Sequence, residues 1–431
     1  MLMLWLACAE VPEDMGNEGD TSAGDTSASE TGWTEGPDCD ELRVLTNDIA
    51  INSSTGEEIF CEKYNALRGD LIATAPIGCL CEVYGTLYAK EDAAFPNLQA
   101  VGDRLYISIN ATDLSGFPSL TRAGDLDIRD SGLVSLHGMD ALKTAETVQL
   151  HQNEDLVTLE GLPWEHLGDA NILLYQNPQL TSLVGMEGLE QAYRINLNAN
   201  QGLTSLEGLH NLTYAHTLGI SGSPLTSLDG LRAMTAMGTF RLYDSPLTSL
   251  TGLEAVETIG TLDLRENQIT SIEPLGGWTE MTGLRIEEDN LVDLAPLSEL
   301  TTLQFLVLGG SSPPTFEDLN SLERIEDQLT ITGPWTHIEG FDSLTVARSL
   351  NCYGSGLTTL DGLDLRNMRD IDLRKNTDLV DVTALNGVGT VVGNVGIIEN
   401  TALGDEAARA LVEAIGEDNI GGVVTIEDNH P

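Results

Sequence analysis

Positive charge is scarce in this chain of 431 residues, which contains 20 Lys and Arg against 68 Asp and Glu. The formal net charge at pH 7 is therefore −48. Binding of nucleic acid needs basic side chains that displace counterions from phosphates, so the composition argues against a nucleic-acid partner. It equally disfavours attraction to anionic membrane surfaces. The acidic residues either keep the chain soluble in a salty or divalent-rich medium or form calcium sites. No EF-hand loop or glycine–aspartate nonapeptide, the motifs of such calcium sites, is present.

Aromatic residues are also few, at 5% of the chain, although 41% of its residues are apolar. A core built from Leu and Ile in regular layers fits this profile better than an irregular globule. A chain of this length would ordinarily divide into several globular domains. An array of repeats does not need to divide, because each unit contacts only its neighbours.

Motifs of catalysis are missing as well. The seven His residues show no H-E-x-x-H or other metal-binding spacing, and no G-x-S-x-G or phosphate-binding glycine loop follows a strand pattern. We therefore expect no enzymatic activity and no cofactor. An exported polysaccharide-degrading β-helix enzyme is the remote alternative, but the basic catalytic cluster of such enzymes is not visible beside an acidic calcium site.

The only apolar run that could serve as a signal is residues 1–7, MLMLWLA, which lead directly into Cys8. Residues 9–38 are rich in Gly, Ser, Thr and acid, which predicts a disordered linker. The arrangement resembles the export signal of bacterial lipoproteins, which implies that Cys8 is lipidated. A plain secretion signal and an uninformative terminus are the alternatives. We expect a lipoprotein of the cell envelope or surface, or a secreted protein, with membrane contact only through the lipid.

Four of the six cysteines, Cys39, Cys61, Cys79 and Cys81, cluster before the regular repeats. In an exported chain this clustering predicts a disulfide-linked N-terminal cap, for which three pairings are open. A zinc site is the alternative, although no His accompanies the C-x-C. Cys352 falls on an inward strand position, which predicts a buried free thiol.

Pairs of apolar residues, two positions apart, recur along the chain as half-buried strands require. Thirteen of the fourteen intervals between successive pairs are 21 to 24 residues, and the last is 29. All thirty positions are apolar. The first members of the pairs are Leu105, Leu126, Val148, Ile172, Ile195, Leu218, Phe240, Leu262, Leu284, Leu306, Leu329, Leu350, Ile371, Val395 and Val424.

A polar residue follows each first member by five positions. Small side chains with a donor and an acceptor satisfy backbone groups where a strand turns a corner into the interior, which predicts a structural rather than a catalytic role. Ser fills five of these positions, and Asp289 and Pro334 fill two. The remaining eight form the predicted Asn ladder: Asn110, Asn153, Asn177, Asn200, Asn267, Asn376, Asn400 and Asn429.

A second apolar pair follows each corner and ends in Gly or Pro, as in L-T-S-L-x-G-L, which predicts an extended back segment and a return. Ile259, Leu262, Leu264, Asn267 and Ile269 match the pattern L-x-x-L-x-L-x-x-N-x-L, so the chain resembles the leucine-rich-repeat family. Rungs at 258–303 resemble the 22-residue type of internalins. Those with one extra residue, such as N-P-Q-L at Asn177, resemble the receptor L domain.

The resemblance implies a right-handed solenoid, mostly strand and loop, with one continuous parallel sheet. We expect a cap and divergent first rungs at 39–100, regular repeats at 101–403, and a capping helix with the last rung at 404–431. The helix follows from the shared face of Ala407, Ala408, Leu411 and Ile415. The insertion GGSSPPTFEDL after Leu308 predicts a bend or lip, read either as a binding feature or as a tolerated irregularity.

Side chains between and after each inward pair point outward from the sheet. Arg and Tyr, which anchor many protein interfaces, gather there. We predict a face that binds a protein or glycan, on an otherwise monomeric chain, with Tyr175, Arg241, Tyr243, Arg265, Arg285 and Tyr353. The alternative is a ladder in which Arg241, Asp263 and Arg285 neutralise one another across strands. The chain would then be a structural envelope protein without a specific ligand.

Overall fold

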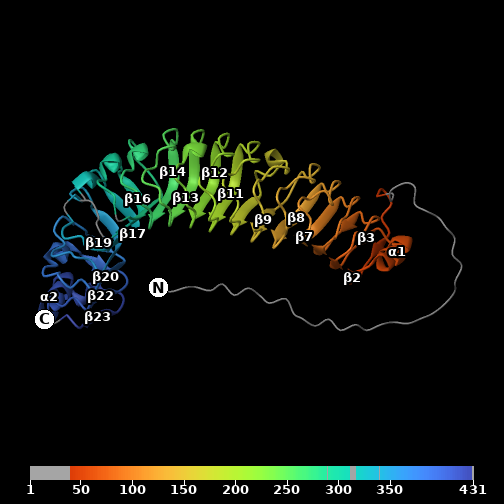
Figure 1. The fold of residues 1–431 in the computed structure, drawn as a ribbon. Coiled ribbons are helices and arrows are strands. Elements are labelled where there is room, and N and C mark those ends of the chain that lie inside the picture. Colours follow the sequence, from red (N-terminus) through yellow and green to blue (C-terminus); the bar gives the residue numbers. More distant parts are fainter. Residues whose placement is uncertain (1–38, 289, 311–316, 339, 430–431) are drawn as a thin grey trace. The chain divides into compact units, whose positions relative to one another are not determined.

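The structure, a computed structural model, describes residues 39–288, 290–310, 317–338 and 340–429, which belong to one compact unit. Period-two apolar patterns form strands, and the strands stack in parallel, so each pattern buries one face against its neighbours (Figure 1). The strands are β1 (Val44–Leu45), β2 (Ile49–Ile51), β3 (Ala66–Leu67), β4 (Leu71–Ala73), β5 (Glu82–Val83), β6 (Leu87–Glu91), β7 (Ala100–Ile109), β8 (Arg122–Arg129), β9 (Thr147–His151), β10 (Asn171–Tyr175), β11 (Gln191–Asn198), β12 (Tyr214–Ser221), β13 (Ala236–Tyr243), β14 (Thr258–Arg265), β15 (Gly283–Glu287), β16 (Thr302–Gly309), β17 (Arg324–Thr332), β18 (Val346–Tyr353), β19 (Asn367–Met368), β20 (Asp370–Arg374), β21 (Thr390–Val391), β22 (Val395–Ile398) and β23 (Val424–Glu427).

One sheet contains 21 of these strands, and β19 pairs with β21 separately. The first rungs hold two short strands each, and the long strand β7 pairs with both β5 and β6, joining them into one sheet. From β7 onward the predicted register is confirmed, since the first inward residues pair with one another from Leu105–Leu126 to Val395–Val424. The chain is a leucine-rich-repeat-type β-solenoid.

The core is a continuous column of aliphatic side chains. From Leu105 to Ile397 both inward positions of every rung are buried, including the free thiol of Cys352. Burial raises the pKa of this thiol to about 12, which keeps it protonated and unreactive at neutral pH. Only the last rung is open, because Val424 is exposed and Ile426 is half-buried.

Among the described rungs, the backs of seven differ from the expected extended segment. Short 3-10 turns occur there and lie on the outer side of the stack, opposite the sheet (Figure 1). Gly208 shows why glycine closes such a return: its φ is 110°, and a Cβ would lie 1.9 Å from the carbonyl oxygen of Leu183. The turns are η1 (Trp164–His166), η2 (Asp229–Leu231), η3 (Glu273–Leu275), η4 (Ala295–Leu297), η5 (Glu317–Leu319), η6 (Thr383–Gly387) and η7 (Glu417–Asn419).

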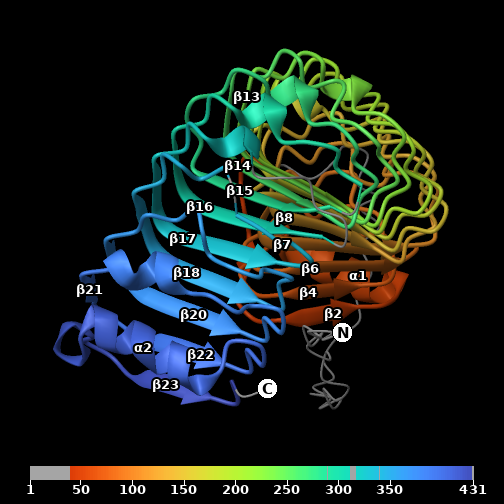
Figure 2. The same ribbon diagram turned by 90° about the vertical axis from the view of Figure 1, so that its left-hand side faces the viewer.

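Two α-helices mark the ends of the stack. The predicted C-terminal helix is confirmed as α2 (Asp405–Ile415), which buries Ala408, Leu411, Val412 and Ile415. It packs against η6 and β23, beside the last strands (Figure 2), and not beyond β23 as a cover for the open end. The N-terminal helix α1 (Ser54–Lys63) was not expected; the Ser53 hydroxyl caps it by accepting the Gly56 N–H at 3.2 Å.

The cap contains two disulfides, Cys39–Cys81 and Cys61–Cys79. Their connectivity selects one of the three pairings that the sequence leaves open. Within the described residues no group of three or more His, Cys, Asp or Glu could hold a metal ion, so the zinc alternative has no ligand set there. Cys8 and the linker at 9–38 lie outside the described residues, as do residue 289 and most of the insertion after Leu308.

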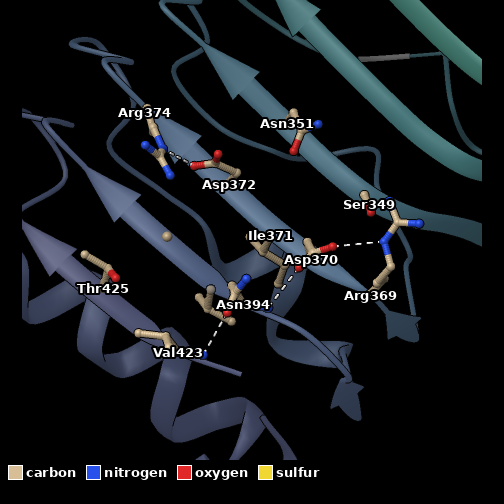
Figure 3. Close-up of a pocket in the computed structure, with 12 residues that line it drawn as sticks. Ser349, Asn351, Arg369, Asp370, Ile371, Asp372, Arg374, Asn394, Val423 and Thr425 are labelled. Carbon is tan, nitrogen blue, oxygen red and sulfur yellow. Dashed lines mark hydrogen bonds and ion pairs between the residues drawn. The ribbon is translucent and has the colours of Figure 1, made fainter. Parts of the chain in front are cut away.

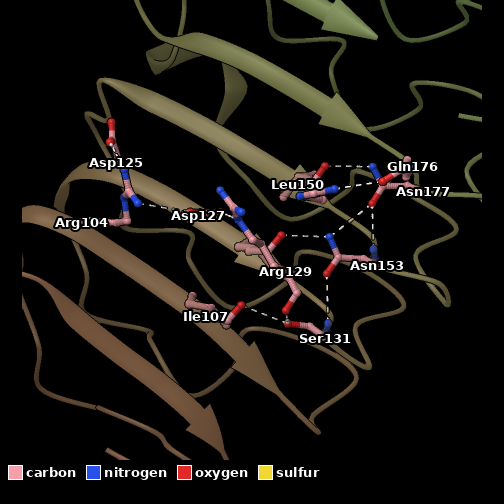
Figure 4. A network of polar contacts seen from close by, with 12 residues as sticks. Arg104, Ile107, Asp125, Asp127, Arg129, Ser131, Leu150, Asn153, Gln176 and Asn177 are labelled. Carbon is pink, nitrogen blue, oxygen red and sulfur yellow. Dashed lines mark hydrogen bonds and ion pairs between the residues drawn. The ribbon is translucent and has the colours of Figure 1, made fainter. Parts of the chain in front are cut away.

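The ladder residues form three hydrogen-bonded runs, Ser131 to Asn200, Ser245 to Glu288 and Ser355 to Asn429, and Figure 4 shows the start of the first. Each Asn amide donates to a strand carbonyl of the preceding rung, as Asn177 does to Leu150 at 3.1 Å. Its carbonyl oxygen accepts the N–H of the preceding ladder residue, as from Asn153 at 3.2 Å. A left-handed residue stands before most ladder positions, for example Gln176 with φ of 54°, and turns the next side chain inward.

Asn110 is a correction to the predicted ladder, because its side chain is exposed. The reason lies in the residue before it. Ile109 is β-branched and resists a left-handed backbone, so it continues β7 and turns its own side chain inward. Its N–H donates to the Ser131 hydroxyl at 3.3 Å, and the ladder begins there.

A carboxylate also enters the ladder. Glu288 is buried, and its carboxylate accepts the side-chain amide of Asn267 at 2.6 Å and the backbone N–H of Asn267 at 3.1 Å. The predicted ladder residue of this rung, Asp289, lies outside the described residues. The longer side chain of Glu reaches the ladder from one position earlier.

Candidate functional site

The outward columns of the sheet carry the predicted binding residues. Strands β13, β14 and β15 pair in register, so Arg241 lies beside Asp263 and Asp263 beside Arg285. In the next column Tyr243 lies beside Arg265 and Arg265 beside Glu287. These neighbours confirm the columns expected from the repeat, and they bring Arg241, Tyr243, Arg265 and Arg285 together.

Asp263 is the centre of this cluster, because it is only 7% exposed although it lies on the outward face. Its carboxylate accepts two hydrogen bonds from the guanidinium of Arg265, at 2.6 and 2.7 Å. It also accepts the hydroxyl of Tyr243 at 2.6 Å. The guanidinium of Arg265 lies 4.7 Å from the centre of the Tyr243 ring, so a cation–π contact covers the ion pair. The three side chains form one rigid unit.

Ionisation of Tyr243 would break this unit. Desolvation and the hydrogen bond to Asp263 raise the pKa of Tyr243 to about 12, and the same carboxylate raises the pKa of Arg265. The pKa of Tyr243 in the folded chain therefore lies above the ordinary tyrosine value of 10.0. The contribution of this tyrosine to stability is therefore complete below pH 10 and is lost as the pH rises from 10 towards 12.

We predict that Tyr243→Phe reduces this alkaline loss of stability. The free energy of unfolding, measured with urea at pH 8 and again between pH 10 and 12, should fall less in the variant than in the wild type. Tyr175→Phe is the matched control, since its hydroxyl makes no hydrogen bond within the described residues. Equal pH dependence in all three proteins would contradict the proposed coupling.

The two remaining arginines of the cluster differ from each other. Arg285 forms an ion pair with Glu287 on its own strand at 3.4 Å. Arg241 is exposed and forms no hydrogen bond or ion pair with any described residue. Its charge therefore faces solvent above a cluster whose other charges are paired.

The other two predicted residues lie away from this cluster. Tyr175 packs edge-on against His151, with ring centroids 6.3 Å apart. Tyr353 is 52% exposed, and the ammonium of Lys375 lies 5.5 Å from its ring centre. The outward face thus brings four of the six predicted residues together and places Tyr175 and Tyr353 at separate points along the sheet.

An acid–arginine clasp recurs on the outward face and was missed from the sequence. Arg129 donates to Asp127 at 2.6 Å (Figure 4), and Arg374 pairs with Asp372 (Figure 3), just as Arg265 pairs with Asp263. The signal was present as D-x-R on a strand, since residues two apart share one face. The pairing of neighbours along one strand, not only across strands, neutralises these arginines.

A depression of about 480 Å³ lies on the same face between β18 and β23. Gly396 forms part of its lining, with Asp372 and Arg374 at one side and Asp370 and Arg369 at the other (Figure 3). The backbone N–H of Asn394 donates to Asp370 at 2.9 Å, and this bond, with the Arg369 guanidinium, lowers the pKa of Asp370. The depression offers charges of both signs without a nucleophile and base in a catalytic arrangement.

No protein-family model and no curated protein matches this chain. Similar solved structures include an internalin from Listeria monocytogenes strain 4b F2365, with 16% identity and a TM-score of 0.36 over 78% of this chain and 75% of that one. A leucine-rich repeat protein from Bacteroides eggerthii has 15% identity and a TM-score of 0.41, over 74% and 62%. A TLR13–ssRNA13 complex has 13% identity and a TM-score of 0.38, over 88% of this chain and 73% of that one.

Proposed function

We propose that this protein is a non-enzymatic binding protein that presents the outward face of its sheet to a protein or glycan partner. One observation carries the proposal: in a chain of net charge −48, Arg241 stands exposed and unpaired beside the rigid Tyr243–Asp263–Arg265 unit. A preformed aromatic and cationic surface loses little side-chain entropy when a partner binds, which favours affinity. An acidic or hydroxyl-rich partner would complement the free guanidinium.

The second candidate is a structural envelope protein without a specific ligand. The paired acid–arginine clasps favour this candidate, because they stabilise the sheet surface without any partner. Arg241 separates the two functions, since it contributes nothing to the clasps and is available only for binding.

We predict that Arg241→Glu strongly weakens partner capture while the chain stays folded. The immobilised full chain is incubated with solubilised cell-surface extracts, and the bound proteins and glycans are quantified by mass spectrometry against protein concentration. Saturable capture should fall at least about tenfold, as expected when one interface charge is reversed. The thermal unfolding temperature should fall only slightly, because the substitution removes no hydrogen bond or ion pair with the described residues but places a second carboxylate across from Asp263.

Arg232→Glu is the matched control, because Arg232 lies on the outer side next to η2 and has the same charge change. Unchanged capture with Arg241→Glu, or an equal loss with Arg232→Glu, would refute the sheet-face proposal. A complete lack of saturable capture would favour the structural alternative.

The proposal includes export and anchoring through Cys8, which would display the sheet outside the cell. The lipoprotein-like order of apolar run, Cys8 and polar linker supports this location. No helix of the described residues is long and apolar enough to cross a membrane. Mass spectrometry of the mature N-terminus would reveal a diacylglyceryl cysteine at position 8, whereas an unmodified Cys8 would exclude the anchor.

A further inference from the structure

A second hollow, of about 620 Å³, lies away from the clasps, where strands β12 to β16 begin. It crosses five neighbouring strands, and four strand spacings of about 4.8 Å make it roughly 19 Å long. These strands are in the interior of the sheet, so their backbone groups are already paired on both sides. Any ligand here must bind through side chains.

Glycines form the floor of the hollow. A Cβ at Gly238 would lie 2.5 Å from the carbonyl oxygen of His216, and one at Gly260 would lie 2.5 Å from that of Gly238. The close approach of successive rungs therefore requires glycine at both positions. Its consequence is a trough without side chains across the middle of the hollow.

Exposed aromatic rings border one end of the trough. The ring of His216 adjoins Gly238, since a Cβ there would lie 3.1 Å from His216 Nδ1. Tyr193 stacks on His216, with ring centroids 5.1 Å apart and planes inclined by 9°. Tyr193 is 47% exposed, and Tyr214, which lines the hollow, is 37% exposed. Such a group of exposed aromatic side chains is rare in a chain with only 5% aromatic residues.

Uncharged hydrogen-bonding groups line the rest of the hollow. The hydroxyls of Thr258 and Thr282 and the carboxamide of Gln304 form no hydrogen bond with the described residues and are free to bind a ligand. Thr282 and Gln304 lie beside each other on neighbouring rungs, since the Gln304 N–H donates to the Thr282 carbonyl. Thr258 lies beside Ala236 in another column. Among the described lining residues Glu280 is the one charged side chain.

We propose that this hollow binds a neutral oligosaccharide. Tyrosine rings offer an apolar face to the C–H groups of a sugar while their hydroxyls stay solvated. Hydroxyl and amide groups on neighbouring rungs match a polymer whose hydroxyls repeat along its length. Glu280 can accept hydroxyl donors, and together with the net charge of −48 it repels uronic-acid or sulfated polymers.

A peptide is the less suitable occupant for two reasons. It cannot add as an extra strand, because β12 to β16 are interior strands that already pair with a neighbouring strand on each side. The hollow also lacks a deep apolar pocket for an anchoring side chain, since Met237 and Ile259 are buried beneath it. The site is separate from the sheet face of the proposed function and does not depend on it.

The test uses the full chain and neutral hexasaccharides of β-1,4-glucose, α-1,4-glucose and β-1,4-N-acetylglucosamine, with oligogalacturonate as the anionic comparison. Calorimetry should detect at least one neutral ligand and weaker or no binding of the anionic one. Tyr193→Ala and Tyr214→Ala should each weaken binding about tenfold, as loss of an aromatic contact implies. Tyr214→Phe, which retains the ring, should keep most of the affinity.

Tyr84→Ala is the matched control, because Tyr84 is a similarly exposed tyrosine of the cap. Far-ultraviolet circular dichroism verifies that every variant is folded. Absence of binding to all neutral ligands, equal loss in Tyr84→Ala, or tighter binding of oligogalacturonate would overturn the proposal. So would a protein partner whose capture requires Tyr193 and Tyr214 in the absence of saccharide binding. Capture that depends on Arg241 reports on the sheet face alone.

Discussion

Asn200→Ala should destabilise the protein by about 3–5 kcal/mol, because each buried backbone group left without a partner costs about 1–3 kcal/mol. The side-chain amide of the fully buried Asn200 donates to the carbonyl oxygen of Leu174 at 2.8 Å. Its oxygen accepts the backbone N–H of Asn177 at 3.0 Å and the Asn177 amide at 3.2 Å. Alanine removes the side-chain partners of the Leu174 carbonyl and the Asn177 N–H in an apolar interior, and it leaves the Asn177 amide with its bond to Leu150 alone.

The loss should appear in urea-induced unfolding and, by hydrogen exchange, first in β10 and β11, since a solenoid couples mainly nearest neighbours. Asn196→Ala is the matched control on β11, because its side chain lies on the outward face and forms no hydrogen bond with the described residues. That variant should change stability by no more than about 0.5 kcal/mol. Similar stabilities for the two variants would show that the ladder is dispensable.

Removal of the Cys61–Cys79 disulfide by paired Cys→Ala substitution should destabilise the cap by about 3 kcal/mol, and removal of Cys39–Cys81 by about 4 kcal/mol. Each disulfide restricts the unfolded chain, and its stabilisation grows with the logarithm of the length of the loop that it closes. The loops span 18 residues for Cys61–Cys79 and 42 residues for Cys39–Cys81. Cap unfolding, followed by hydrogen exchange of β1 to β6, measures both losses.

Cys352→Ala provides the comparison for these variants, since it removes a buried thiol without opening a covalent loop. Its effect should be smaller and confined to the rungs around β18. Peptide mapping under non-reducing conditions tests the pairing itself, and a Cys39–Cys61 or Cys39–Cys79 link would contradict the connectivity.

The inward residues of the rungs could be predicted from the sequence because their burial depends on a period that the chain repeats. The same period predicted the neighbours Arg241–Asp263 and Tyr243–Arg265, since a parallel register follows from equal spacing. The disulfide pairing could not be predicted, because it depends on the path of the divergent first rungs. Helix α1 was missed for the same reason, as no repeat signal covers Ser54–Lys63.

The corner of each rung shows a different limit of prediction from the sequence. Ten non-glycine residues adopt positive φ in the part of the chain that the structure describes, and residues as unlike as Ala199, Glu266 and Lys375 occupy the same corner position. No residue type therefore marks the turn that directs a ladder side chain inward. Asn110 was assigned by its position alone, while the β-branched Ile109 before it kept the strand extended. The clasp of Arg265 on Asp263 was missed for another reason: the prediction considered neighbours across strands and not the D-x-R spacing along one strand.

The ladder has a direction, and that direction bears on how the chain folds during synthesis. Each Asn bonds backward, so the amide of Asn376 remains incomplete until Asn400 supplies its oxygen, and Asn400 in turn requires Asn429. Within each run of the ladder, a rung at the growing end is therefore the least satisfied, and the next rung completes it. We expect folding to advance vectorially from the disulfide-linked cap, as a zipper closed from its N-terminal end.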